Sequence, residues 1–168
     1  MHDILPQSQQ AAILAEVARL STLAPPRTNS DRIYISAQAC VGRMVCPFQD
    51  LDFGNLACAF AVNRCVQFAL GAPIDDALDT RSIYSDLLHG RGQTTEAAPG
   101  AIIVSPTLYQ TTGTVHGHVG IIGEDGAIFS NSSAPATVGH WMQNYTVASW
   151  QADLQTRRGL RTYIFNVI

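Results

Sequence analysis

The sequence predicts an α+β protein in which helices come first and a mostly antiparallel sheet follows. Helical periodicity and helix-ending residues occur before residue 90, whereas four apolar, strand-like segments follow Pro99-Gly100. The 168 residues, 46% of them hydrophobic and only 14% charged, suffice for one folded domain with a buried core. Grouping helices before strands is typical of the α+β class.

The first predicted helix spans residues 7–24, where apolar residues recur at helical spacing until Pro25-Pro26 ends the pattern. Residues 28–52 show no strong period. They favour a loop with a short strand or turn around residues 33–35. We therefore divide the single domain 1–168 into an N-terminal helix and loop extension, 1–50, and a core, 51–168.

The second predicted helix reads GNLACAFAVNRCVQFALG, with Asn55 as its expected cap and Gly71 as its stop. A third, shorter helix is expected over residues 76–88, ending at Gly90. The strands are expected within 101–106, 116–122, 127–133 and 162–168, and a hairpin loop within 123–126.

Composition excludes several classes of function. The formal net charge of −3 and the absence of any Lys or Arg run give no footprint for nucleic acid. No stretch approaches the roughly 20 apolar residues that span a bilayer. No basic segment leads into an apolar one at the amino end, so we expect synthesis in the cytoplasm without an ordinary secretory signal.

The four cysteines, at positions 40, 46, 58 and 65, form no C-x-x-C pair. Their spacing therefore fits neither a disulfide framework nor a zinc ribbon. The sequence leaves a disulfide between Cys40 and Cys46 open.

Cys58 is the first candidate for chemistry because it lies in the first turn of the predicted second helix. Successive residues of a helix advance by about 100°, which places Cys58 at the top of the core-facing stripe and Asn63, Arg64 and Gln67 opposite. First-turn amides and the helix dipole favour a thiolate. A buried, inert cysteine is the alternative.

His118 is the second candidate because it opens the apolar strand GHVGII. An imidazole at a strand end, beside a thiol, is a suitable general base. A packing histidine is the alternative. His116 shares its strand face, so a His-x-His metal site is open, but no third ligand lies at a suitable spacing.

The ordered set of a cysteine at a helix start, PGAIIVSP, GHVGII and a hairpin into AIFSNSS resembles the papain-like NlpC/P60 and CHAP amidases. These enzymes cut peptidoglycan peptides. The resemblance covers roughly residues 50–133 and implies N-terminal helices packed on an antiparallel sheet. Because the cysteine precedes the histidine, it favours the non-permuted branch of the superfamily.

By this resemblance, Cys58 is the nucleophile and His118 the general base. A third polar group on the next strand orients the ring. Direct counting through the hairpin indicates Ser130, but a one-residue bulge would substitute Asn131, whose carbonyl is the better acceptor and which we favour. Ala57 and Ala59 flank the cysteine where the family often has Asp and Ser, which leaves the subfamily open.

The implied reaction is amide hydrolysis through a thioester, without a cofactor or metal. Gln49 or Asn55 is expected to join the Cys58 N–H in holding the oxyanion. The expected substrate is a peptidoglycan stem or cross-bridge peptide. The residues expected to contact it are Tyr84, Tyr109, His116, Ser130, Trp141 and Tyr145.

Without a signal segment, a wall-cutting enzyme is expected to be a secretion-system antibacterial effector, with a cognate inhibitor protecting the producer, or a phage lysin. Two alternatives remain open. One is a cysteine protease or acyltransferase acting on protein or lipid, and the other is a non-catalytic binding module that keeps the fold.

Overall fold

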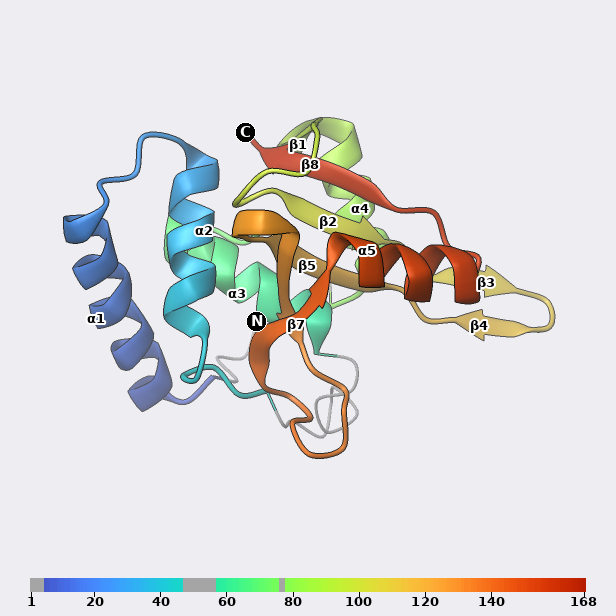
Figure 1. Cartoon of the computed structure of the whole chain (residues 1–168), viewed down its shortest axis with the longest axis horizontal. Helices are drawn as coiled ribbons and strands as arrows, with labels where there is room; N and C mark the ends of the chain where they lie inside the picture. The colour runs from blue at the N-terminus through green and yellow to red at the C-terminus, as the bar shows by residue number, and fades with distance from the viewer. Residues whose placement is uncertain (1–4, 47–56, 76–77) are drawn as a thin grey trace.

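The computed structural model describes residues 5–46, 57–75 and 78–168 and has the expected α+β architecture (Figure 1). The helices are α1 (Gln7–Leu23), α2 (Asn29–Cys40), α3 (Cys58–Leu70), α4 (Thr80–Asp86) and α5 (Val147–Trp150). Helix α4 continues as a wider π-helical turn over Leu87–Arg91, and α5 continues in the same way over Gln151–Arg157.

A six-stranded sheet forms the centre of the molecule, in the order β1-β8-β2-β5-β6-β7, and each neighbouring pair runs antiparallel. Its strands are β1 (Gly92–Thr94), β2 (Ile102–Ser105), β5 (His118–Ile122), β6 (Ala127–Asn131), β7 (Trp141–Thr146) and β8 (Tyr163–Val167). A separate hairpin, β3 (Leu108–Gln110) with β4 (Gly113–Val115), projects as an arm (Figure 1).

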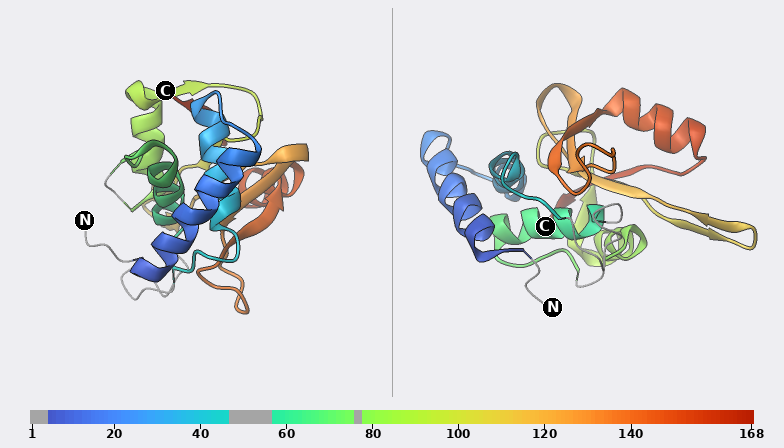
Figure 2. Two further views of the ribbon diagram at one scale, coloured as in Figure 1. Left: turned by 90° about the vertical axis from the view of Figure 1, so that its left-hand side faces the viewer. Right: turned by 90° about the horizontal axis from the view of Figure 1, so that it is seen from below.

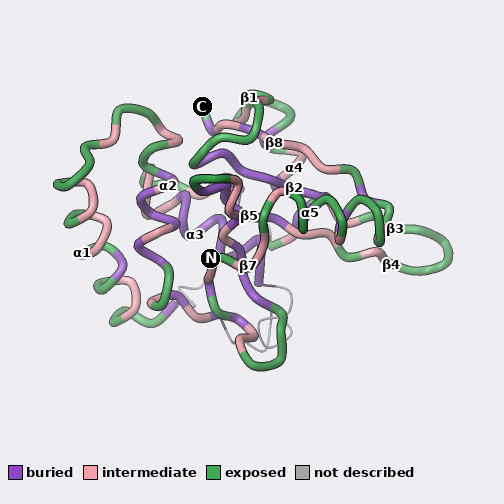
Figure 3. The backbone as a smooth tube through the Cα atoms, viewed as in Figure 1, coloured by how far each residue is buried: buried purple, intermediate pink, exposed green. Residues whose placement is uncertain are grey.

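The sheet lies between two helical layers, with α3 on one face and the α5 segment on the other (Figure 2). Alternate residues of β5 point to opposite faces, so Val119 and Ile121 join the core around α2 and α3, while Ile122 joins the core around Trp150. Burial is greatest in α3 and the central strands, whereas the β3–β4 arm is exposed (Figure 3).

The expected elements around the candidate site are confirmed. Helix α3 begins at Cys58 and its last residue is Leu70. The next residue, Gly71, caps the helix with the left-handed φ of 85° that favours glycine at this position. Helix α4 begins later than expected because the Asp79 carboxylate caps it, accepting from the amides of Arg81 and Ser82. The expected cap Asn55 lies outside the described residues.

The loop and strand expected around residues 33–35 are wrong, because this segment is helix α2. Thr28 and Asp31 form a reciprocal capping box at its start. Ile33 and Ala37, four residues apart, are both fully buried. The buried side of the helix also includes Ser36 and Ala39, and such small or polar residues weaken the apolar period in the sequence. Helices α1 and α2 thus pack into the same core as α3.

Strand β7, the β3–β4 arm and the helical segment over residues 147–157 were not predicted. Strand β7 mixes polar and aromatic residues, and only one of its six residues is fully buried. Its Trp141 is that residue, with 1% of its surface exposed.

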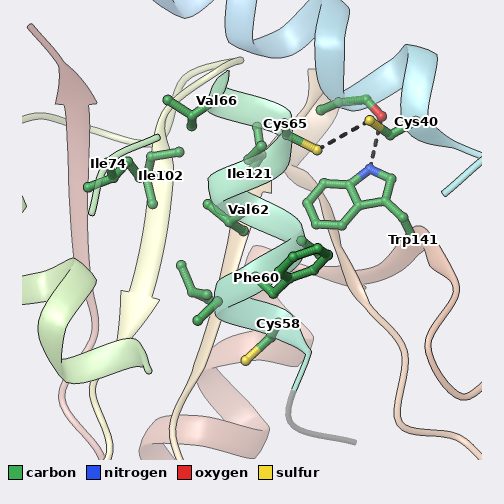
Figure 4. Close-up of a cluster of buried hydrophobic side chains, with 14 of the residues drawn as sticks. Cys40, Cys58, Phe60, Val62, Cys65, Val66, Ile74, Ile102, Ile121 and Trp141 are labelled. Atoms are coloured by element: carbon green, nitrogen blue, oxygen red, sulfur yellow. Dashed lines mark hydrogen bonds between the residues drawn. The ribbon is translucent and has the colours of Figure 1, made fainter. Parts of the chain in front are cut away.

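All four cysteines are free thiols, so the Cys40–Cys46 disulfide that the sequence left open is not formed. The sulfur of Cys40 lies 3.5 Å from that of Cys65, across the α2–α3 interface (Figure 4). Cys46 is also buried. In the part of the chain that the structure describes, no helix has the length and apolar character needed to cross a membrane.

Candidate active site

Cys58 is the first residue of α3 and lies at its amino-terminal end, whereas Cys65 lies further along the same helix (Figure 4). Only 7% of its surface is exposed. Burial raises the pKa of the thiol to about 11, although hydrogen bonds from the backbone amides of Val119, Ala59 and Cys58 itself lower it. The expected low pKa is therefore not found: burial outweighs the helix amides, and the resting thiol is protonated.

The helix around Cys58 is buried on more sides than its amphipathic pattern predicts. Asn63 and Arg64, expected to face solvent, are 3% and 6% exposed. The Asn63 side chain accepts a hydrogen bond from the Ile74 amide at 3.0 Å and donates to Asp75 at 2.7 Å. These contacts tie α3 to the segment that follows it.

His118 is the first residue of β5, and the glycines at positions 117 and 120 allow this strand to lie close to its neighbours. A Cβ on Gly117 would lie 2.1 Å from the carbonyl oxygen of Ser105, so only glycine permits the strand to start this close to β2. A Cβ on Gly120 would lie 2.7 Å from the Ile128 side chain. Both glycines keep the strands around the His118 ring in close contact.

A chain of three polar side chains determines the tautomer of His118. Nε2 of His118 lies 2.9 Å from Oγ of Ser130, and Ser130 donates to Oδ1 of Asn144 at 2.6 Å. Because the hydroxyl proton of Ser130 is directed to Asn144, Nε2 of His118 must donate to Ser130. Nδ1 is then the unprotonated nitrogen, which is the form that a general base requires.

The hydrogen-bond partner of His118 is Ser130, and the favoured Asn131 is not joined to the ring. The hairpin register is regular, with Ile121 opposite Phe129 and Ile122 opposite Ile128, so no bulge moves Asn131 into that place. The Asn131 amide donates to the carbonyl of Ser132 at 3.2 Å. Adjacent strand residues face opposite sides, so direct counting gives the right residue.

Sequence analysis did not predict a role for Asn144, because its position depends on an irregularity in the pairing of β6 with β7. The β6–β7 register shifts between Ile128, opposite Tyr145, and Phe129, opposite Gln143, so that Asn144 is the extra residue. Bulges commonly redirect one side chain in this way. Asn144 also donates to the Asn131 carbonyl at 3.5 Å, which orients its amide oxygen toward Ser130.

Cys58 and His118 line one crevice of about 290 Å³, together with Thr107, Tyr145 and Arg158. Cys58 comes from the helix on one face of the sheet. The His118 ring packs on the other face, against Trp150 at a centroid distance of 5.3 Å. Both residues therefore line the crevice at the start of β5, from opposite faces of the sheet. Among the described residues, no hydrogen bond joins the thiol to the ring.

Burial lowers the pKa of His118 to about 4, and the positive charge of Arg158 acts in the same direction. Asp153 opposes this effect. At neutral pH the crevice is therefore lined by a neutral thiol and a neutral imidazole.

Asp153 fixes the polar wall of the crevice. Its carboxylate accepts from the Tyr145 hydroxyl at 2.9 Å and from Arg158 at 3.0 and 3.1 Å, and it also pairs with Arg157. Burial would raise the pKa of Asp153, but these hydrogen bonds lower it to about 2. Sequence analysis missed this cluster because Tyr145 lies on β7, whereas Asp153 and the two arginines come from the helical segment that follows.

The residues expected to contact substrate divide into three groups. His116 and Tyr145 line the crevice with Cys58. Tyr84 lies in an adjoining cavity, which Tyr109 shares with the crevice. Trp141 is wrong as a substrate contact, since it is buried and its indole N–H donates to the Ala37 carbonyl at 2.9 Å (Figure 4).

The second oxyanion donor, expected at Gln49 or Asn55, lies outside the described residues. Within the described ranges, no group of three His, Cys, Asp or Glu side chains is placed to hold a metal ion. Comparisons with protein-family models, curated sequences and solved structures give no match to this chain.

Proposed function

We propose that the protein is a cysteine amidase with a papain-like, NlpC/P60-type arrangement. The observation that carries the proposal is that Cys58 and His118 line one crevice, with the His118 ring hydrogen-bonded to Ser130 on the next strand. The helix-borne thiol, the strand-borne imidazole and the orienting polar residue on the next strand support this class.

In the proposed acylation, Nδ1 of His118 takes the thiol proton as the sulfur attacks the amide carbonyl carbon. The carbonyl electron pair moves to oxygen, and the backbone N–H of Cys58 donates to the oxyanion. When the carbonyl re-forms, the C–N bond breaks and the imidazolium gives its proton to the leaving amine. The product on the enzyme is a thioester.

In deacylation, Nδ1 takes a proton from water as its oxygen attacks the thioester carbon. The C–S bond then breaks, the acid product leaves, and the proton returns to the sulfur. Because both groups are neutral at rest, the proton transfer accompanies attack instead of preceding it. This agrees with the raised pKa of Cys58 and the lowered pKa of His118.

The proposed substrate is a peptide of bacterial peptidoglycan, cut at an amide bond of the stem or the cross-bridge. The resemblance of the residues around Cys58 and His118 to the wall amidases supports this choice. The proposed biological setting is an antibacterial effector delivered by a secretion system and neutralised by a cognate inhibitor protein, or a phage lysin.

Digestion of purified peptidoglycan tests the proposal, with the muropeptides analysed by mass spectrometry. We expect new amine and carboxylate ends from the wild-type protein and none from Cys58→Ala. Cys65→Ala is the matched control, because Cys65 lies in the same helix but points into the core. If the peptidoglycan stays uncut and a protein or lipid ester is turned over instead, the non-wall alternative is favoured. If no substrate is turned over, a binding module is favoured.

A further inference from the structure

A second cavity, of about 430 Å³, adjoins the crevice that holds Cys58. We call it the arginine–tyrosine groove, after the residues that give it its character: Arg81, Tyr84, Tyr109, Arg161 and Tyr163. Thr107 and Tyr109 line both cavities. A ligand that extends from the crevice past these two residues therefore enters the groove.

The wall between the two cavities is held by hydrogen bonds. The hydroxyls of Thr80 and Thr107 lie 3.0 Å apart, and the Thr107 amide donates to Thr80 at 2.9 Å. Thr107 also accepts from the Gly117 amide at 3.0 Å, immediately before His118. The groove is thus connected directly to the strand that carries the proposed base.

The groove has a positive wall. Arg81 and Arg161 line it, and no acidic side chain does. Neither arginine forms an ion pair with a described residue, unlike Arg157 and Arg158, which both pair with Asp153. Asp79, at the start of α4, offsets part of the Arg81 charge, but its carboxylate is engaged in capping the helix.

An aromatic ring contacts one of these arginines, Arg81. The Arg81 guanidinium lies 5.8 Å from the centre of the Tyr109 ring, within the range of a cation–π contact. The rings of Tyr84 and Tyr163 lie 4.5 Å apart and form an aromatic surface beside them. Planar guanidinium groups above aromatic surfaces are suited to binding carboxylates with two hydrogen bonds.

We propose that the arginine–tyrosine groove binds a carboxylate-bearing part of the amide substrate whose scissile bond lies at Cys58. The inference rests on the proposed function and adds a chemical requirement to it: the part of the substrate that extends from the crevice into the groove carries a free carboxylate. Thr107 and Tyr109 form the passage between the two sites.

Calorimetric titration of the non-cleaving Cys58→Ala protein tests the inference without relying on turnover. The two probes are a peptidoglycan stem tetrapeptide with free carboxylates and the same peptide with its carboxylates converted to primary amides. We expect the acid peptide to bind at least about tenfold more tightly, as charge-assisted hydrogen bonds require. Adding Arg81→Gln and Arg161→Gln should abolish that preference.

The matched control replaces both Arg27 and Arg32 with Gln and so also removes two positive charges, because both residues are exposed and neither lines the groove. We expect it to leave both affinities unchanged. Equal binding of the two peptides to the parent protein, or an unchanged preference in the double arginine variant, would overturn the inference. In the active enzyme, the double variant should raise KM for the acid peptide at least about tenfold with little change in kcat. Binding without any turnover by wild type would instead count against the proposed function alone.

Discussion

The hydroxyl of Ser130 lies 2.9 Å from Nε2 of His118, and this contact determines which ring nitrogen carries the proton. The Ser130 hydroxyl donates its hydrogen bond to Oδ1 of Asn144, so the ring donates to Ser130 through Nε2. The base-competent nitrogen is therefore Nδ1. The predictions below follow from this arrangement and from the burial of the two central groups.

Ser130→Ala should lower kcat by about 10- to 100-fold, because the ring loses the partner that sets its tautomer. Asn144→Ala should have an effect of the same kind but smaller, since it acts through Ser130. Steady-state kinetics on a soluble peptide substrate measures both. Asn131→Ala provides the contrast: a folded Asn131→Ala protein that loses more kcat than Ser130→Ala would contradict the assignment.

Alkylation of Cys58 by iodoacetamide should be slow at pH 7 and should rise toward pH 11. The thiolate is the reactive form, and burial raises the pKa of the thiol to about 11. Mass spectrometry of the labelled protein against pH measures the midpoint. Cys58→Ala should remain unlabelled while folded, because the other three cysteines are 0% exposed whereas Cys58 is 7% exposed. A labelling plateau below pH 8 would show a pre-formed thiolate instead.

The free energy of unfolding should fall as the pH drops from about 6.5 to about 4. In the folded protein the pKa of His118 is lowered to about 4 from an ordinary value of 6.5, so only the unfolded chain takes up a proton in that window. The loss is roughly 3 kcal/mol at most and ends below pH 4.

Urea unfolding at several pH values measures this loss. His118→Gln should remove His118's share of the pH dependence, whereas His140→Gln, a substitution of an exposed histidine, should not. An identical slope for His118→Gln and wild type would show that the ring is not buried in its neutral form.

Asp153→Asn should destabilise the fold by about 2 kcal/mol, because Arg158 and Tyr145 lose a shared anionic partner. It should also shift the acid limb of the kcat/KM profile to lower pH. Asp153 raises the pKa of His118 and Arg158 lowers it, so losing the carboxylate leaves the Arg158 effect unopposed. Thermal unfolding and a pH–rate profile measure the two effects. A limb that moves to higher pH would contradict this sign.

Local patterns were sufficient to predict the placement of Cys58 and His118. The bounds of the helix and the strand are determined by nearby residues. Gly71 ends the helix that begins at Cys58, and Gly117 and Gly120 lie on either side of His118 in its strand. The antiparallel register of the hairpin also follows from counting. Ser130 was accordingly within reach, and only the preference for a stronger acceptor led to Asn131.

The other parts of the site depend on contacts between distant segments. Asn144 reaches Ser130 through a bulge in β7, and Arg158 reaches the crevice because Asp153 holds it. Trp141 resembles a rim aromatic in sequence, yet α2 covers it. None of these contacts produces a periodic pattern or a motif spacing that can be recognised in a single sequence.

The central claim, that the Cys58 sulfur forms a covalent bond to the substrate carbonyl, is tested most directly by trapping the thioester. The protein is mixed with a cleavable peptide, quenched in acid within one turnover, digested, and analysed by mass spectrometry. The account predicts an acyl group on the peptide containing Cys58 in wild type, and no acyl group on Cys58→Ala or His118→Ala. Turnover of the same peptide by folded Cys58→Ala, or acylation at another residue, would contradict it.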